Sequence, residues 1–187
     1  MNLQQITDAL LSSPIIAATD HRNWQDALPT KAAVLFHLNA NIITISDDLK
    51  KAKASGKATF VHIDLADGIG KDKTGIKWLA ELGADGIITT RSQLVRHAKD
   101  CGLIAVQRFF VLDSKGMHAI FESLENTQPD LIEIMPGVIP KVLKLFSTQS
   151  IPVIAGGLVE TKAEVTAALG NGALAISSGQ RTLWNMD

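Results

Sequence analysis

The sequence lacks tyrosine altogether and contains a single cysteine among its 187 residues. Cys101 therefore has no partner for an internal disulfide, which fits a protein of the reducing cytoplasm. No apolar run approaches the roughly 20 residues of a membrane-spanning helix. The N-terminus also lacks the basic start and apolar centre of a signal peptide. These absences predict a cytoplasmic protein without a membrane partner.

The chain also has no excess of basic residues, because its formal net charge is −1. Proteins that bind nucleic acid mainly through its phosphates are usually basic, so a role with RNA would need a local basic patch. The sequence has no cluster with metal-ligand spacing, no GxGxxG fingerprint and no P-loop. No lysine lies at the end of an expected strand, which disfavours Schiff-base chemistry. We therefore expect no metal, no cofactor and no catalytic residue.

Apolar residues make up 46% of the chain and charged residues 20%, which is typical of a globular domain, here a single one over residues 1–187. Eight apolar runs of strand length recur, and most lack the polar alternation of a half-exposed strand. The runs cover residues 15–19, 33–38, 59–63, 86–89, 104–111, 131–135, 152–155 and 173–176.

Helical patterns lie between these runs, several of them ending at a glycine. Thr161 and Glu164 have the spacing of a capping box at the start of one helix. Eight strand–helix units predict a compact (β/α)8 barrel of the TIM type with short loops. The alternative is a doubly wound open sheet, which needs only five or six units.

Two turns of small residues near the C-terminus predict an anion site. Gly156 and Gly157 follow one apolar run, and Ser177, Ser178 and Gly179 follow the next, with a helical pattern after each turn. In a (β/α)8 barrel the loops after strands 7 and 8 form the usual phosphate site, where glycine allows close backbone approach and a helix N-terminus offers N–H groups. Ordinary loop residues are the alternative interpretation.

Polar side chains follow most of the other expected strands. His62 and Asp64 are two residues apart, which would place them on one face of a strand above Phe60, either at a ligand or in an internally bonded polar cap. Arg108 lies within an apolar strand, and Glu133 on the next strand is its expected partner. This pair is compatible with a buried structural ion pair and with a ligand contact made by Arg108.

At this point a resemblance emerges in several linked motifs. The segments are 61–69 (VHIDLADGI), 86–92 (GIITTRS), 107–113 (QRFFVLD), 132–140 (IEIMPGVIP), 151–157 (IPVIAGG) and the terminal Thr182-Leu-Trp184. They resemble, in order, the glycerol-3-phosphate-responsive antiterminators. The resemblance runs from about residue 58 to the end of the chain and is weaker over the first 50 residues.

The resemblance implies a TIM-barrel regulator, not an enzyme. Members of this family sense glycerol 3-phosphate and bind a leader mRNA of glycerol-utilisation genes, which prevents termination. By motif, the phosphate would lie at Gly156, Gly157, Ser177 and Ser178. The glycerol end would be surrounded by His62, Asp64, Arg108 and Glu133.

The slightly acidic chain leaves two versions of the RNA role open. In one, RNA binds a local basic face that includes Arg91, Arg96 and Lys99, in a homo-oligomer. In the other, this member has kept the ligand site and lost or changed the RNA role.

Two other function classes also remain. An isomerase or lyase of a small phosphorylated substrate would use His62, Asp64 and Glu133 as acid–base groups. A metabolite-sensing protein without RNA binding would signal to another protein.

Overall fold

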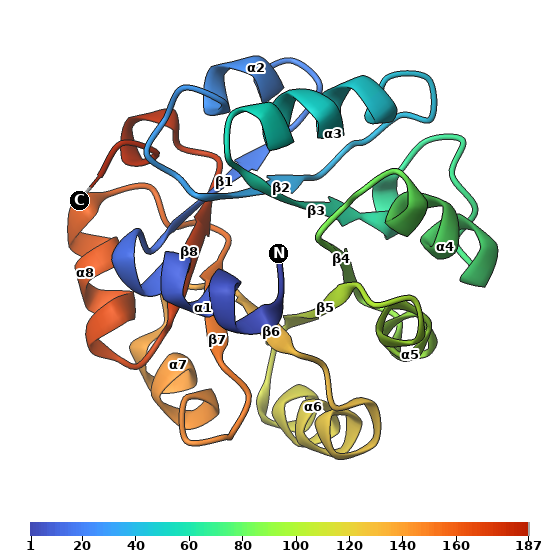
Figure 1. Ribbon diagram of the computed structural model, residues 1–187. Coiled ribbons are helices and arrows are strands. Elements are labelled where there is room, and N and C mark those ends of the chain that lie inside the picture. Colours follow the sequence, from blue (N-terminus) through green and yellow to red (C-terminus); the bar gives the residue numbers. More distant parts are fainter. Residues whose placement is uncertain (187) are drawn as a thin grey trace.

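The computed structural model, which describes residues 1–186, is a closed barrel of eight parallel strands in which β8 pairs with β1 (Figure 1). The closed ring confirms the (β/α)8 prediction and excludes the open sheet. The strands are β1 (Ile15–Thr19), β2 (Val34–His37), β3 (Ala58–His62), β4 (Gly86–Thr89), β5 (Ile104–Phe110), β6 (Leu131–Met135), β7 (Val153–Gly156) and β8 (Ala175–Ser178).

Within the described residues, seven helices follow the first seven strands as alternation predicts, and one more helix precedes the first strand. They are α1 (Leu3–Ser12), α2 (Trp24–Ala27), α3 (Ile45–Ala54), α4 (Lys73–Glu81), α5 (Ser92–Asp100), α6 (Ser114–Thr127), α7 (Pro140–Phe146) and α8 (Lys162–Gly170), with 3-10 turns η1 (Ile63–Leu65) and η2 (Arg181–Leu183). No helix within residues 1–186 combines the length and apolarity needed to cross a membrane.

Five strand ends differ from the sequence prediction by one or two residues, and three of these bear on predicted site residues. The third strand stops at His62, so Asp64 lies in the following 3-10 turn and not on the strand. The seventh strand includes Gly156, and the eighth includes both Ser177 and Ser178. The predicted turns therefore begin later, because pairing with neighbouring strands extends the ladder through residues whose local propensity favours a loop.

Apolar side chains fill the barrel interior, and α1 closes its N-terminal end. Phe36 and Phe60 face each other inside with ring centroids 5.7 Å apart. Ile6 and Leu10 of α1 are fully buried in the same cluster, and Figure 1 shows the helix crossing the open end of the barrel. The sequence analysis did not predict α1. This plug leaves the opposite end, where the strands terminate, as the only mouth of the described barrel.

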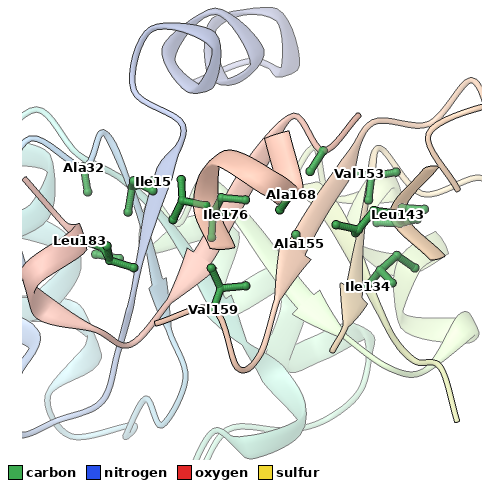
Figure 2. Close-up of a cluster of buried hydrophobic side chains, with 14 of the residues drawn as sticks. Ile15, Ala32, Ile134, Leu143, Val153, Ala155, Val159, Ala168, Ile176 and Leu183 are labelled. Atoms are coloured by element: carbon green, nitrogen blue, oxygen red, sulfur yellow. The ribbon is translucent and has the colours of Figure 1, made fainter. Parts of the chain in front are cut away.

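The outer layer packs the other face of each strand against the helices. Figure 2 shows Ile134, Ala155 and Ile176, which lie on β6, β7 and β8, in one cluster with Leu143 of α7 and Ala168 of α8. The predicted capping box at Thr161 and Glu164 begins α8 and is confirmed. Strands buried on both faces explain why the sequence showed unbroken apolar runs.

Candidate functional site

The carboxyl ends of the strands surround a cavity of about 390 Å³. Of the residues predicted to bind a ligand, Arg108, Glu133, Gly157, Ser177, Ser178 and Gly179 line it. The predicted residues Gly156, His62 and Asp64 are not part of its lining. The remaining walls consist of Ala18, Leu38, Met135, Leu158, Val159, Glu160 and Gln180. Leu38 and Met135 stand at the ends of predicted strands, but apolar residues there gave no functional signal.

Arg108 and Glu133 form the charged floor of this cavity. The two residues are partners in the β5–β6 register, and the Nε of Arg108 donates to Oε2 of Glu133 at 2.6 Å. Their side chains are only 8% and 1% exposed, so the ion pair is nearly removed from water. The predicted pairing is confirmed. A guanidinium bonded through Nε still has four N–H donors on its two Nη atoms, which a ligand in the cavity can use.

Gly156 contributes through Glu133. A Cβ atom at Gly156 would lie 2.3 Å from Oε1 of Glu133, far inside van der Waals contact. The absence of a side chain at Gly156 therefore makes room for the carboxylate. The sequence analysis assigned this glycine to phosphate approach, whereas its nearest functional neighbour is the buried acid.

The turn after β7 is the tightest part of the wall. Gly157 has φ +72° and Leu158 has φ +61°, so two successive residues occupy the left-handed region. A leucine there carries strain of about 1–3 kcal/mol, of the kind that accumulates at binding sites. The N–H of Gly137, after β6, donates to the carbonyl of Gly157 at 3.1 Å and fixes the turn from the neighbouring loop.

The two serines of β8 have different environments. Ser178 donates its hydroxyl to the carbonyl of Val159 at 2.6 Å and accepts from the N–H of Gln180, so it holds the two loops together. Ser177 lines the cavity, and its hydroxyl has no hydrogen-bond partner within residues 1–186. Ser177 is therefore the serine available to a ligand.

The helix N-termini contribute less to this site than the sequence suggested. At α8, the carboxylate of Glu164 accepts from the N–H groups of Glu160 and Thr161, each at 2.9 Å. These hydrogen bonds lower the pKa of Glu164, the Glu160 amide having the largest effect. After β8 there is only the three-residue turn η2. A bound anion would thus rely on the loop backbone, Arg108 and Ser177.

Asp64 lies in the 3-10 turn after β3, which corrects the sequence prediction that it shares a strand with His62. Asp64 accepts hydrogen bonds from Thr89 Oγ1 at 3.0 Å and from the amide and hydroxyl of Thr90, at 2.7 and 3.0 Å. Its pKa is lowered, because burial, which would raise it, is outweighed by these hydrogen bonds. Asp64 thus fixes the loop after β4 to the loop after β3.

His62 is buried at the end of β3 and stays neutral near pH 7. Burial, reinforced by the positive charge of Arg108, lowers its pKa to about 4. Its Nδ1 atom is buried without a hydrogen-bond partner among the described residues. A neutral imidazole near Arg108 can exchange a hydrogen bond with a ligand but is a weak general base at neutral pH.

The three basic residues predicted to bind RNA lie on α5 and at its N-cap. Arg91 precedes α5 at the mouth, where its Nε lies 3.5 Å from Asp64. Lys99 lies in the last turn of α5 and donates to the carbonyl of Gln128 at 2.6 Å. Arg96 is exposed between them. Their role in RNA binding stays a prediction.

The site shows no arrangement for metal chemistry. Within residues 1–186, no three His, Cys, Asp or Glu side chains come close enough to hold a metal ion. No lysine lines the cavity either.

Comparison with solved structures identifies close relatives of this barrel. The glycerol uptake operon antiterminator regulatory protein of Listeria monocytogenes superposes with a TM-score of 0.87 at 32% identity, covering 92% of this chain and 95% of the other. A glycerol uptake operon antiterminator-related protein of Thermotoga maritima has a TM-score of 0.83 at 37% identity, covering 93% and 99%. A putative deoxyribose-phosphate aldolase of Coccidioides immitis, at 12% identity and a TM-score of 0.70 over 91% and 82%, shares the fold alone.

Sequence comparison agrees. The uncharacterized protein YgcP of Escherichia coli K12 is 36% identical over 181 residues, which span 95% of this chain and 94% of that protein. The family model described as glycerol-3-phosphate responsive antiterminator matches residues 15–184. With this match over most of the barrel, the chain belongs to the glycerol-3-phosphate responsive antiterminator family.

Proposed function

We propose that this protein is a cytoplasmic regulator that binds glycerol 3-phosphate in the cavity at the barrel mouth and, in response, binds a leader mRNA of glycerol-utilisation genes. The observation that carries the proposal is the composition of the cavity. It combines a buried cation (Arg108), a buried carboxylate (Glu133) and an unpaired hydroxyl (Ser177) beside a left-handed backbone turn. A ligand that has both a phosphate and free hydroxyl groups satisfies all of them.

Each group has a defined part in this proposal. The Nη atoms of Arg108 and the hydroxyl of Ser177 donate to phosphate oxygens, and the turn at Gly157 brings the backbone close to them. Glu133 accepts from a glycerol hydroxyl while its other interactions keep it in place. His62 and Asp64, which the sequence analysis placed at the glycerol end, do not line the cavity and have no part in this assignment.

The same groups favour sensing over turnover. Glu133 is held by Arg108, Asp64 by three hydrogen bonds from Thr89 and Thr90, and His62 is a weak base at neutral pH. All three acid–base candidates are thus engaged in the structure or poorly matched to proton transfer. We therefore propose a ligand-gated protein that is not an enzyme and needs no cofactor.

A ligand panel tests the cavity assignment. Ligands that bind the native state raise the melting temperature in proportion to RT ln(1 + [L]/Kd). Glycerol 3-phosphate should raise it clearly, and glycerol far less. Gly157→Asp should abolish the shift, whereas Gly157→Ala, which shares the backbone strain but adds no charge, should retain part of it. An equal response to glycerol contradicts the phosphate assignment.

A separate assay tests the proposed binding of leader mRNA. Glycerol 3-phosphate should tighten binding of the leader RNA, and by reciprocity the RNA should tighten binding of the ligand by the same factor. The affinity should fall with increasing salt. An RNA affinity that saturating ligand leaves unchanged excludes the switch, and turnover of a triose phosphate by pure protein supports the enzyme alternative.

A further inference from the structure

The exposed apolar side chains are concentrated at the barrel mouth. Of the eleven large hydrophobic residues that are exposed within residues 1–186, six lie on loops that follow strands, and a seventh, Phe110, ends β5. We call these seven residues the mouth ring; the six on loops are Ile42, Ile43, Leu65, Leu112, Ile139 and Leu158. Leu112 and Ile43 are the most exposed, at 89% and 86%.

The mouth ring is large enough for a stable interface. Its seven exposed fractions add up to about four whole side chains, on the order of 700 Å² of apolar surface, against the roughly 800 Å² per partner of a standard protein–protein interface. Isolated apolar residues on a surface are normal, whereas here seven of them gather on the loops at one end of the barrel.

A groove adjoins the mouth ring. An apolar groove of about 680 Å³ between α6 and α7 begins at Leu112 and Ile139 of the mouth ring and continues past Met117 and Leu145. The same molecule therefore carries protruding apolar side chains, such as Ile43, and an apolar groove. A two-fold symmetric contact needs a surface of this kind, because the same patch must supply both partners.

The charges of these loops do not suit a phosphodiester backbone. The loops between the strands and the following helices contain three basic residues, against six acidic ones. Two of the three basic residues are already paired, Arg22 with Asp20 and Arg91 with Asp64. Two of the acids, Asp72 and Asp113, cap helices. Most charges of the loops are thus satisfied internally, and the exposed cations next to them, Lys73, Lys115, Lys141 and Lys162, lie at the first turns of the helices. Apolar contact is what the loops themselves offer.

The mouth ring is continuous with the ligand cavity. Leu158 lines the cavity and is also 67% exposed, so it belongs to both the cavity and the mouth ring. The loop after β6 bonds to the same turn through the N–H of Gly137, and Ile139 follows two residues later. A ligand that fixes the turn after β7 therefore also fixes part of the ring.

We propose that the mouth ring is the interface of a homodimer, in which a second copy of this chain packs face to face over the ligand cavity. Dimerisation and ligand binding are then linked, since each orders the turn at Gly157 and Leu158 for the other. The inference rests on the proposed function only for the identity of the ligand.

Sedimentation equilibrium across protein concentrations tests this, with and without glycerol 3-phosphate. The wild type should dimerise, and the ligand should lower the dimer dissociation constant. The double variant Ile43→Asp/Leu112→Asp should raise that constant at least roughly tenfold, because two-fold symmetry brings four added carboxylates into an apolar contact. Leu11→Asp is the matched control: Leu11 is 69% exposed but lies on α1 at the closed end, so it should have no effect.

A wild type that stays monomeric at all concentrations, a double variant that still dimerises, or a dimer indifferent to the ligand overturns the inference. Melting shifts and RNA binding on the same samples separate it from the proposed function. A monomer that still binds glycerol 3-phosphate and RNA contradicts the proposed dimer but not the proposed function. If the double variant instead loses RNA affinity without any change in mass, the mouth ring is an RNA surface and the dimer is wrong.

Discussion

At the scale of single residues, Glu133 is the side chain on which the site depends. It accepts from Arg108 at 2.6 Å, it is 1% exposed, and Gly156 leaves room for its other oxygen. An ion pair this deeply buried is weak support for stability, because desolvation offsets the attraction. Its retention at the floor of a ligand cavity is better explained by recognition.

This explanation can be tested with the pair itself. Arg108→Met should destabilise the fold by about 3–5 kcal/mol, because it leaves the Glu133 carboxylate buried without a partner. Arg108→Met/Glu133→Met should recover most of that loss, since no uncompensated charge remains. Both variants should fail to show a melting shift with glycerol 3-phosphate. Chemical denaturation and the ligand melting shift measure the two effects, and a double variant that binds like the wild type would show that the pair is structural only.

His62 makes stability depend on pH in a defined window. Its folded pKa of about 4 lies below the ordinary value of 6.5, so between these values the unfolded chain binds a proton that the folded chain does not. The contribution of neutral His62 to the free energy of unfolding is therefore fully present above pH 6.5. It is lost as the pH drops toward 4, which lowers the free energy of unfolding by about 3 kcal/mol in total. Burial lowers the pKa of His37 as well, with the same sign.

His62→Gln should accordingly flatten the slope of unfolding free energy between pH 6.5 and 4.5 without removing it. Urea denaturation at several pH values gives this slope. A slope identical to that of the wild type would mean that His62 ionises freely in the folded protein.

At the scale of elements, the β7 and β8 strands place the site by extending further than their sequences suggest. Gly156 and Ser177 are partners in the β7–β8 register, so the ladder itself delivers a glycine and a serine to the cavity wall. Beyond the strands, the loops are joined by Ser178 and by the N–H of Gly137. The wall thus continues directly from the sheet into two loops that are bonded to each other and to the loop after β6.

Two glycines of this wall should respond differently to substitution. Gly156→Ala should lower both stability and ligand affinity, because its Cβ would meet Glu133 at 2.3 Å. Gly179→Ala should be tolerated in stability, since the nearest atom to its Cβ, the Ala18 carbonyl oxygen, is 3.8 Å away. Thermal unfolding of the pair distinguishes packing against Glu133 from a general need for glycine; equal losses in both would favour the latter.

At the scale of the whole molecule, α1 determines which end of the barrel is available. It begins with a capping box formed by Asn2 and Gln5, and it buries Ile6 and Leu10 in the barrel interior. The closed end therefore has a core, whereas the other end keeps the polar cavity and the mouth ring.

Leu10→Ala should cost about 2–5 kcal/mol, because it removes a fully buried side chain from the plug. Leu11→Ala, one residue away but 69% exposed, should change stability by less than about 0.5 kcal/mol. Denaturant unfolding measures both, and a tolerated Leu10→Ala would mean that α1 does not close the barrel in solution.

The strand–helix alternation was predictable because its signals are local. Apolar runs buried on both faces, glycine stops and the Thr161 capping box each depend on a few neighbouring residues. The Arg108–Glu133 pair was predictable as well, since consecutive strands of a barrel are neighbours and a buried charge needs a partner. The position of Asp64 beyond the end of the strand was not predictable, because its hydrogen-bond partners Thr89 and Thr90 are distant in sequence.

The sequence by itself determined the barrel, the family and the residue types available at the carboxyl ends of the strands. Tertiary structure alone decided which of them meet. It places Ser177 in the cavity wall and uses Ser178 to join two loops. It also packs Gly156 against Glu133 and bonds Asp64 to Thr90. It also gathered apolar residues from separate loops into one ring. The physical reason is that strand pairing and burial are cooperative over the closed sheet, so each side chain's direction depends on contacts distant in sequence.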